Sequence, residues 1–189
     1  MGNVTELIDL WNNTRNGDDK SYALLHHHLY PGLFTYAVKM VKDEDLADDL
    51  LQDLFINFWQ KKLHIGVINN VRSYFYRATR SIVLNHLKSS QIKESKLGAM
   101  PEPELEFSTE DLILSQEFNA ELTSLMAAAL NKLPAKQREV IYMRFYQNME
   151  YNQIAEITGT RYQSVINNVY RGIQVLRNVC SPTDLYAVS

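Results

Sequence analysis

Apolar residues recur at helical spacing along nearly the whole chain, and this pattern constrains the fold more than any other feature. The segment DEDLADDLLQDLFINFWQKK, which begins at Asp43, has enough apolar residues for one buried face, namely Leu46, Leu50, Leu51, Leu54, Ile56 and Phe58. The chain has only 7 Gly and 5 Pro, which leaves little material for the many turns of an all-β fold. We find no strong strand candidate and no internal repeat. The sequence therefore predicts an all-α protein.

A linker interrupts the helical pattern near the middle of the chain. KLGAMPEPELEFSTED contains two prolines, a glycine and a run of acids, which is typical of a linker. The spacing predicts two small helical domains at 5–95 and 119–180, joined by an acidic linker at 96–118. Pro31 is expected to kink or break a helix of the first domain. Pro134 is expected in the first turn of a helix of the second domain.

Charge is divided into blocks that the net value of −3 conceals. Residues 71–96 carry six basic side chains and one acid, and 132–180 carry seven basic side chains and three acids. Between them, 97–131 carry seven acids and no basic residue. Phosphate backbones respond to local charge, so a mildly acidic protein of this kind can still carry nucleic-acid surfaces.

The stretch NQIAEITGTRYQSVINNVYRGI, which begins at Asn152, has the spacing of a helix-turn-helix. Gly159 is expected to end the first helix, Thr160 to cap the second, and Val165 to face inward. The outer side of the second helix has no acid and consists of Gln163, Ser164, Asn167, Asn168, Arg171 and Gln174. Amides can pair with adenine edges and arginine with guanine or phosphate, so this side is a candidate DNA-reading face. An ordinary polar surface is the alternative.

A second candidate nucleic-acid face lies on the helix predicted from Val71 to Lys88, which Asn70 is expected to cap. A helical wheel places Val71, Tyr74, Phe75, Ala78 and Ile82 toward the core. Arg72, Arg77, Arg80 and Lys88 fall on another arc, interleaved with Tyr76. Basic side chains with an aromatic ring suit a single strand that is held by its phosphates and stacked through its bases. A solubilising basic face with Tyr76 half buried is the alternative.

Four motifs together resemble a known family. ADDLLQDLFINFW, from Ala47 to Trp59, resembles the core-polymerase-binding helix of bacterial sigma factors. LYPGLFTYA before it, YRATRSIVLNHLK after it and LPAKQREVIYMRFYQNMEYNQIAEITG further along fall in the family's order. Over residues 20–95 and 120–178 the chain resembles an extracytoplasmic-function (ECF) sigma factor of the sigma-70 family. This type consists of a region 2 helical bundle and a region 4 helix-turn-helix.

The resemblance implies a role for each face. Core-polymerase binding would fall to Asp49, Gln52, Asp53 and Asn57. The promoter's −10 element would be held by Asn69, Asn70, Arg72, Tyr76, Arg77, Arg80 and Lys88, with the loop at 63–70 receiving an unstacked base. The duplex −35 element would be read by Arg161, Gln163, Ser164, Asn167, Asn168 and Arg171. The acidic linker would either imitate nucleic-acid charge near the RNA path or serve as a plain tether.

The expected partners are bacterial core RNA polymerase, promoter DNA and an anti-sigma factor. The sequence departs from the family's usual pattern at Ile166, Asn167 and Asn168, where basic or small polar residues are common, and this leaves the −35 preference open. Two other functions remain possible on the residues. One is a conventional helix-turn-helix regulator that works without polymerase, and the other is a decoy that occupies polymerase without promoter activity.

Several other classes of function find no support in the sequence. Consecutive side chains of a helix diverge by about 100°, so His26, His27 and His28 cannot converge on one metal ion. No P-loop, nucleophile elbow or His-Glu-x-x-His motif is present, so we expect neither a cofactor nor an enzyme. The single cysteine, Cys180, indicates a reducing compartment. With no signal peptide and no membrane-spanning stretch, we expect a cytoplasmic protein that does not insert into membranes.

Overall fold

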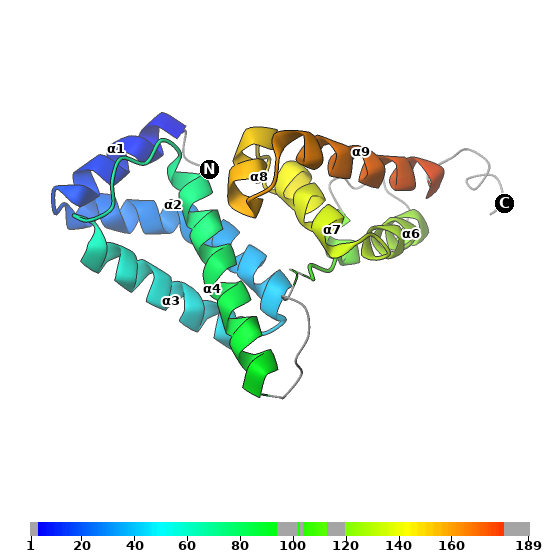
Figure 1. Cartoon of the computed structure of the whole chain (residues 1–189), viewed down its shortest axis with the longest axis horizontal. Coiled ribbons are helices and arrows are strands. Elements are labelled where there is room, and N and C mark those ends of the chain that lie inside the picture. Colours follow the sequence, from blue (N-terminus) through cyan, green and yellow to red (C-terminus); the bar gives the residue numbers. More distant parts are fainter. Residues whose placement is uncertain (1–3, 94–101, 103, 113–119, 180–189) are drawn as a thin grey trace. The chain divides into compact units, whose positions relative to one another are not determined.

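The computed structural model describes residues 4–93, 102, 104–112 and 120–179. All regular structure in these residues is helical, which confirms the predicted all-α class. The chain divides into two compact units, one formed mostly by residues up to 101 and the other mostly by residues from 102 onward. Figure 1 shows the helices of each unit in the order of the chain.

The first unit contains four long helices, which are α1 (Val4–Arg15), α2 (Asp19–Val41), α3 (Glu44–Lys61) and α4 (Val71–Lys93). Its core is aromatic. Phe58 of α3 packs against Trp11 of α1 and Phe75 of α4, with ring centroids 4.6 and 4.2 Å apart. Asn70 accepts a hydrogen bond from the backbone N–H of Ser73 at 2.8 Å, so it caps α4 as predicted.

Pro31 does not break the helix, because α2 continues through this residue to Val41, and a kink there stays a prediction. Proline removes the N–H that would bond the carbonyl four residues earlier, on His27. Both Pro31 and His27 are exposed, so water can satisfy that carbonyl. Leu29 and Leu33, on the opposite side, are buried and hold the helix to the bundle on both sides of the proline.

The second unit contains α5 (Thr109–Leu112), α6 (Ala120–Asn131), α7 (Ala135–Ile141), a π-helix η1 (Tyr142–Tyr146), most of α8 (Tyr151–Thr158), and α9 (Tyr162–Val179). Leu130, Ile141, Met143 and Val165 are among its buried residues. Pro134 occupies the N-cap of α7, one position before the predicted first turn. The π-helix was not predicted.

Part of the predicted linker is packed on the second unit. Leu105 and Phe107 are 0% and 4% exposed. The Asn131 side chain bonds the Phe107 backbone twice, since its Oδ1 accepts from the N–H at 2.8 Å and its Nδ2 donates to the carbonyl at 2.9 Å. The Phe107 ring lies 5.4 Å from that of Tyr146. We call Glu104–Phe107 the strap, and the remainder of the 96–118 boundary stays a prediction.

Gly172 allows α7 and α9 to approach closely. It is buried in α9, and an added Cβ would overlap Cδ1 of Ile141 and come within 3.1 Å of its Cγ1. Replacing an exposed helical glycine by alanine usually stabilises a protein by up to about 1 kcal/mol. Here overpacking, which typically costs about 1–3 kcal/mol, opposes that gain.

We therefore expect Gly172→Ala to destabilise the second unit by about 1 kcal/mol. Adding Ile141→Val, which removes the overlapping Cδ1, should restore most of the loss, whereas Ile141→Val in the parent chain should destabilise it. Urea denaturation of the four proteins measures this cycle. A Gly172→Ala variant more stable than the parent would contradict the packing argument.

Candidate protein-binding and nucleic-acid interfaces

The predicted polymerase-binding residues lie together on one side of α3. Asp49, Gln52, Asp53 and Asn57 are all exposed, while Ala47, Leu51, Phe55 and Phe58 on the other side are buried. Ile56 lies among the four and is 54% exposed, so its predicted place on the buried face is wrong. We call these five residues the acidic face. Protein interfaces combine an apolar centre with a polar rim, and Ile56 surrounded by polar side chains fits this composition.

The acidic face is supported from below by aromatic packing. The Tyr22 hydroxyl donates to the Phe55 carbonyl at 2.6 Å, and its ring lies 4.8 Å from that of Trp59. Burial raises the pKa of Tyr22 to about 12, so the hydroxyl remains a donor at neutral pH. Phe55 is buried, and Trp59 is half-buried.

The three consecutive histidines have separate environments. The His26 ring packs 4.9 Å from Tyr30 and 4.5 Å from Phe55, and burial lowers its pKa. His28 lies 3.5 Å from Glu6 of α1. In the part of the chain that the structure describes, no group of His, Cys, Asp or Glu residues could hold a metal ion.

The four predicted basic residues of α4 differ in how far their side chains are exposed. Arg77 and Lys88 are exposed, and Arg72 and Arg80 are partly buried. Asn69 is exposed, while Asn70 uses its side-chain oxygen as the cap of α4. In the preceding loop, Leu63 and Val67 expose 73% and 85% of their surface.

The predicted exposure of Tyr76 is wrong. This residue is only 1% exposed, and its ring lies 5.5 Å from that of Tyr36 on α2. The Arg72 guanidinium carbon lies 5.5 Å from the Tyr76 ring centroid. Burial raises the pKa of Tyr76 to about 12, with Arg72 acting in the opposite direction. Tyr76 therefore supports Arg72 from beneath and does not offer a free ring for base stacking.

Tyr74 shows the reverse error. It was predicted to be core but is half-buried, and burial raises its pKa while Arg77 lowers it. Ala78 and Ile82 are also half-buried, whereas Val71 and Phe75 are buried as predicted. A helical wheel of α4 alone could not show that Tyr76 is buried and Tyr74 is partly exposed, because Tyr76 is covered by a different helix, α2.

The helix-turn-helix is formed by α8 and α9. Gly159 ends α8 with φ +66°, as predicted for its C-terminal stop. The Val165 N–H donates to the Arg161 carbonyl at 3.2 Å, so Arg161 holds the N-cap position of α9, one residue later than the predicted cap at Thr160. Val165 is buried, as predicted.

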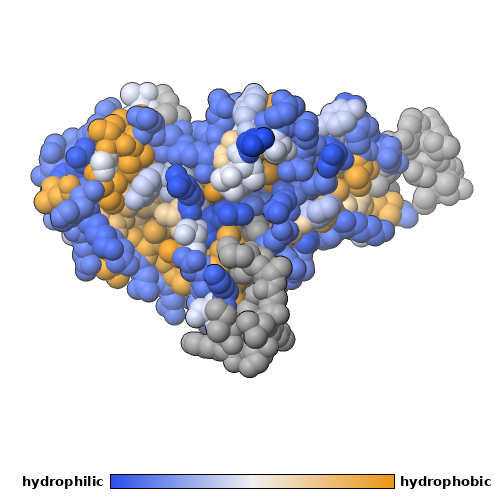
Figure 2. Space-filling model, viewed as in Figure 1, coloured by the Kyte–Doolittle hydropathy of each residue, from blue (hydrophilic) through white to orange (hydrophobic). Residues whose placement is uncertain are grey.

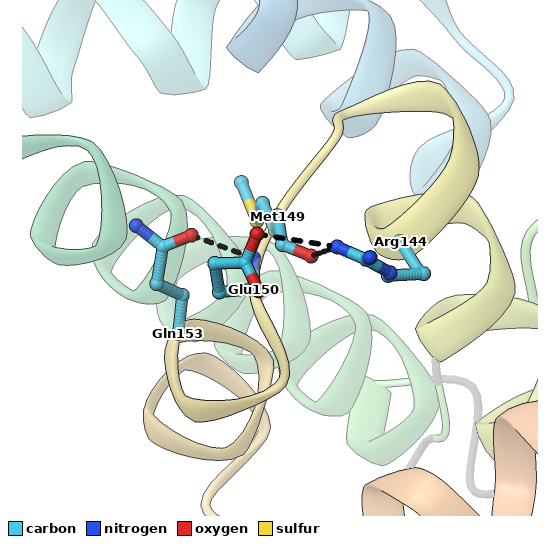
Figure 3. A network of polar contacts seen from close by, with 4 residues as sticks. All are labelled: Arg144, Met149, Glu150 and Gln153. Carbon is cyan, nitrogen blue, oxygen red and sulfur yellow. Dashed lines mark hydrogen bonds and ion pairs between the residues drawn. The ribbon is translucent and has the colours of Figure 1, made fainter.

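A polar network fixes the start of α8 (Figure 3). Arg144 of η1 donates through Nη1 to the Met149 carbonyl at 2.9 Å and lies 3.5 Å from Glu150 Oε1. The Glu150 N–H donates to Gln153 Oε1 at 2.8 Å, one half of a capping box. The Arg144 guanidinium also lies 4.9 Å from the ring of Tyr151, which contacts Tyr162 at the start of α9. This network joins η1 to both helices of the motif.

The outer side of α9 presents the predicted reading residues. Arg161, Gln163, Ser164, Asn167 and Arg171 are exposed and Asn168 is partly buried. Gln163 Nε2 donates to Asn167 Oδ1 at 3.1 Å, which aligns two amides. Tyr162 and Tyr170, exposed by 47% and 61%, were missed. Tyr170 follows Gln163 by seven residues, so helical periodicity already placed it on this side.

Figure 2 colours one face of the molecule by hydropathy and shows both apolar and polar regions on it. Among the described residues, no helix is long and apolar enough to cross a membrane.

Comparisons with known proteins match both units. Residues 25–92 match the family model for Sigma-70 region 2, and residues 124–176 match that for Sigma-70, region 4. RNA polymerase sigma factor SigV of Bacillus subtilis is 26% identical over 152 residues, which are 80% of this chain and 86% of SigV. ECF RNA polymerase sigma factor SigL of Mycobacterium tuberculosis is 26% identical over 147 residues, or 77% of this chain and 80% of SigL.

Two solved structures share the fold. The sigma factor RpoE of Bartonella quintana, in complex with the anti-sigma factor NepR, superposes with a TM-score of 0.62 at 21% identity, covering 86% of this chain and 98% of that one. CnrH, in complex with the cytosolic domain of CnrY, gives a TM-score of 0.63 at 16% identity, covering 97% and 99%.

Proposed function

This chain belongs to the sigma-70 family and is an ECF RNA polymerase sigma factor, and from this premise we propose which of its surfaces perform each step of initiation. The acidic face of α3 binds core RNA polymerase. The basic side of α4 holds the opened −10 element, and the outer side of α9 reads the −35 element as duplex. The observation that carries this assignment is the clustering of Asp49, Gln52, Asp53 and Asn57 on one exposed side of α3.

Promoter opening follows from differential binding. Arg72, Arg77, Arg80 and Lys88 neutralise phosphates along one strand, while Asn69 and the exposed apolar side chains of the 63–70 loop contact an unstacked base. Unstacking a base costs a few kcal/mol. A surface that binds the separated strand more tightly than the duplex supplies this free energy and shifts the equilibrium toward the open state.

Reading of the −35 element depends on amide groups more than on charge. Gln163, Asn167 and Asn168 offer paired donors and acceptors to base edges in the major groove, and Ser164 can contact either a base or the backbone. Arg161, at the N-cap of α9, suits a phosphate, and Arg171 suits a guanine or a phosphate.

The proposal carries several further assignments. Region 2 corresponds to residues 5–95 and region 4 to 119–180, with the strap acting as an addition to region 4. The protein acts in the cytoplasm, where its polymerase is, and catalyses no covalent reaction itself. The sigma factor RpoE, which shares the fold, forms a complex with the anti-sigma factor NepR, so we propose that this chain is also restrained by an anti-sigma factor.

Run-off transcription tests the function. Purified core polymerase is incubated with a promoter library, with and without the chain, and the transcripts are sequenced. Specific initiation that requires the chain supports the sigma-factor assignment. A shift of duplex DNA without initiation would favour a conventional regulator, and binding to core polymerase with neither activity would favour a decoy.

Arg171→Ala should weaken −35 duplex binding about 10-fold, because a good side-chain contact to a base contributes about 1–3 kcal/mol. Arg171 is exposed, so the fold should be unaffected. Fluorescence anisotropy with a −35 duplex over a range of salt concentrations measures the loss. A loss restricted to one base position indicates a base contact, whereas a uniform loss with a smaller salt slope indicates a phosphate contact. Unchanged affinity would move the reading face away from this residue.

A further inference from the structure

Asp48 lies beside the acidic face on α3, and both of its carboxylate oxygens accept side-chain hydrogen bonds. The hydroxyl of Tyr30, from α2, donates to Oδ1. Nε2 of Gln52, one helical turn further along α3, donates to Oδ2 at 2.5 Å. Neither Tyr30 nor Asp48 was among the residues predicted to contact polymerase, yet both are linked to one that was.

The chemistry of the carboxylate dictates how the Gln52 amide is turned. An ionised carboxylate only accepts hydrogen bonds, so the NH₂ group of the amide must face Asp48. The amide carbonyl Oε1 then points away from Asp48. A glutamine side chain that is free in solution samples many rotamers, and ordering it on binding lowers affinity. The bond to Asp48 orders Gln52 before any partner arrives.

Tyr30 is itself held in place by its neighbours. Its ring stacks on Phe34, with centroids 5.7 Å apart, and on His26, with centroids 4.9 Å apart. Burial raises the pKa of Tyr30 to about 12, so its hydroxyl carries its proton at neutral pH and can donate to Asp48. The contact connects the orientation of a surface glutamine on α3 to the packing of α2.

We propose that Asp48 and Tyr30 are positioning residues that turn the Gln52 carbonyl outward, so that Gln52 accepts a hydrogen bond from an Arg or Lys side chain of the polymerase. The neighbouring carboxylates of Asp49 and Asp53 are also acceptors, and both are exposed. Gln52 therefore extends a row of acceptors and selects for a donor-rich partner surface. This inference rests on the proposed role of the acidic face.

The test is a double-mutant cycle on binding of the full chain to core polymerase. We expect Gln52→Ala to raise the dissociation constant about 10-fold, which is the loss of one good interface hydrogen bond. Asp48→Ala should raise it about 5-fold, and the double variant should be no weaker than Gln52→Ala, because Asp48 acts through Gln52. Tyr30→Phe, which keeps the ring, should cause a smaller loss that also disappears in the Gln52→Ala background.

Two further variants keep the test decisive. Glu44→Ala removes an exposed acid from the same helix outside this network and should change the dissociation constant less than 2-fold, which controls for net charge. Asp48→Asn keeps the size of the side chain but has one acceptor oxygen in place of two, so it should also weaken binding if Asp48→Ala does not fold.

The outcomes separate this inference from the proposed function. Losses from Asp48→Ala and Gln52→Ala that multiply in the double variant would overturn the inference, because Asp48 would then act independently. So would binding that is insensitive to Asp48→Ala or to Gln52→Ala while the parent chain still binds polymerase. Failure of the parent chain to bind core polymerase would instead overturn the proposed function.

Discussion

Asp53→Arg should abolish association with core RNA polymerase, weakening it about 100-fold or more. Removing one partner of a charge pair at an interface costs about 2–5 kcal/mol, and reversal of the charge adds repulsion from the same donor-rich surface. Asp53 is exposed in the middle of the acidic face, so the substitution should leave the helical bundle intact. Native gel shift or biolayer interferometry with purified core polymerase measures the effect.

The control for this prediction is Asp9→Arg, which makes the same charge change at an exposed position of α1, outside the acidic face. It should bind polymerase nearly as well as the parent chain. Duplex binding by region 4 should survive in both variants, because the substitutions lie in the other unit. Equal loss in the two variants would show that overall charge, and not the acidic face, drives association.

Phe107→Ala should destabilise the second unit by about 3–5 kcal/mol, the usual result of truncating a buried aromatic side chain. The Phe107 ring is 4% exposed and packs on Tyr146. Phe107 is the last residue of the strap, and its backbone N–H donates a hydrogen bond to the Asn131 side chain. Without the ring, the strap loses its largest apolar anchor, and Tyr146 loses one aromatic neighbour while keeping another, Tyr142. A residue from the predicted linker would thus prove to be part of the core of region 4.

Native-state hydrogen exchange measures this effect in the whole chain. Amides of α6, α7 and α9 should exchange about 100-fold faster or more in Phe107→Ala, while those of α2 and α4 keep their protection. Leu125→Ala serves as the comparison, because Leu125 is 50% exposed on α6 and its truncation should change little. Unchanged protection in α7 and α9 would mean that the strap contributes no stability, and that the segment functions as a plain tether.

The sequence was sufficient wherever the decisive property is local to one helix. The resemblance of ADDLLQDLFINFW to a core-polymerase-binding helix singled out Asp49, Gln52, Asp53 and Asn57, and the structure shows all four exposed on one side of α3. Asn70 and Gly159 were predicted from capping chemistry, which involves only neighbouring backbone groups, and both occupy the predicted positions. The order of the motifs indicated the family, which the two family models confirm.

Only the tertiary structure shows which side chains are buried by another helix and which form hydrogen bonds with residues far away in the sequence. Tyr76 was predicted to be exposed because the wheel of α4 records only one helix, but Tyr36 of α2 packs against it. The alternation of glutamates with Leu105 and Phe107 has no helical period, so only the long-range bonds from Asn131 reveal a strap. The bond from Tyr30 to Asp48 likewise joins residues on different helices. Helical periodicity is a property of the local backbone, whereas burial and side-chain pairing depend on which segments meet, and that is determined when the whole unit packs.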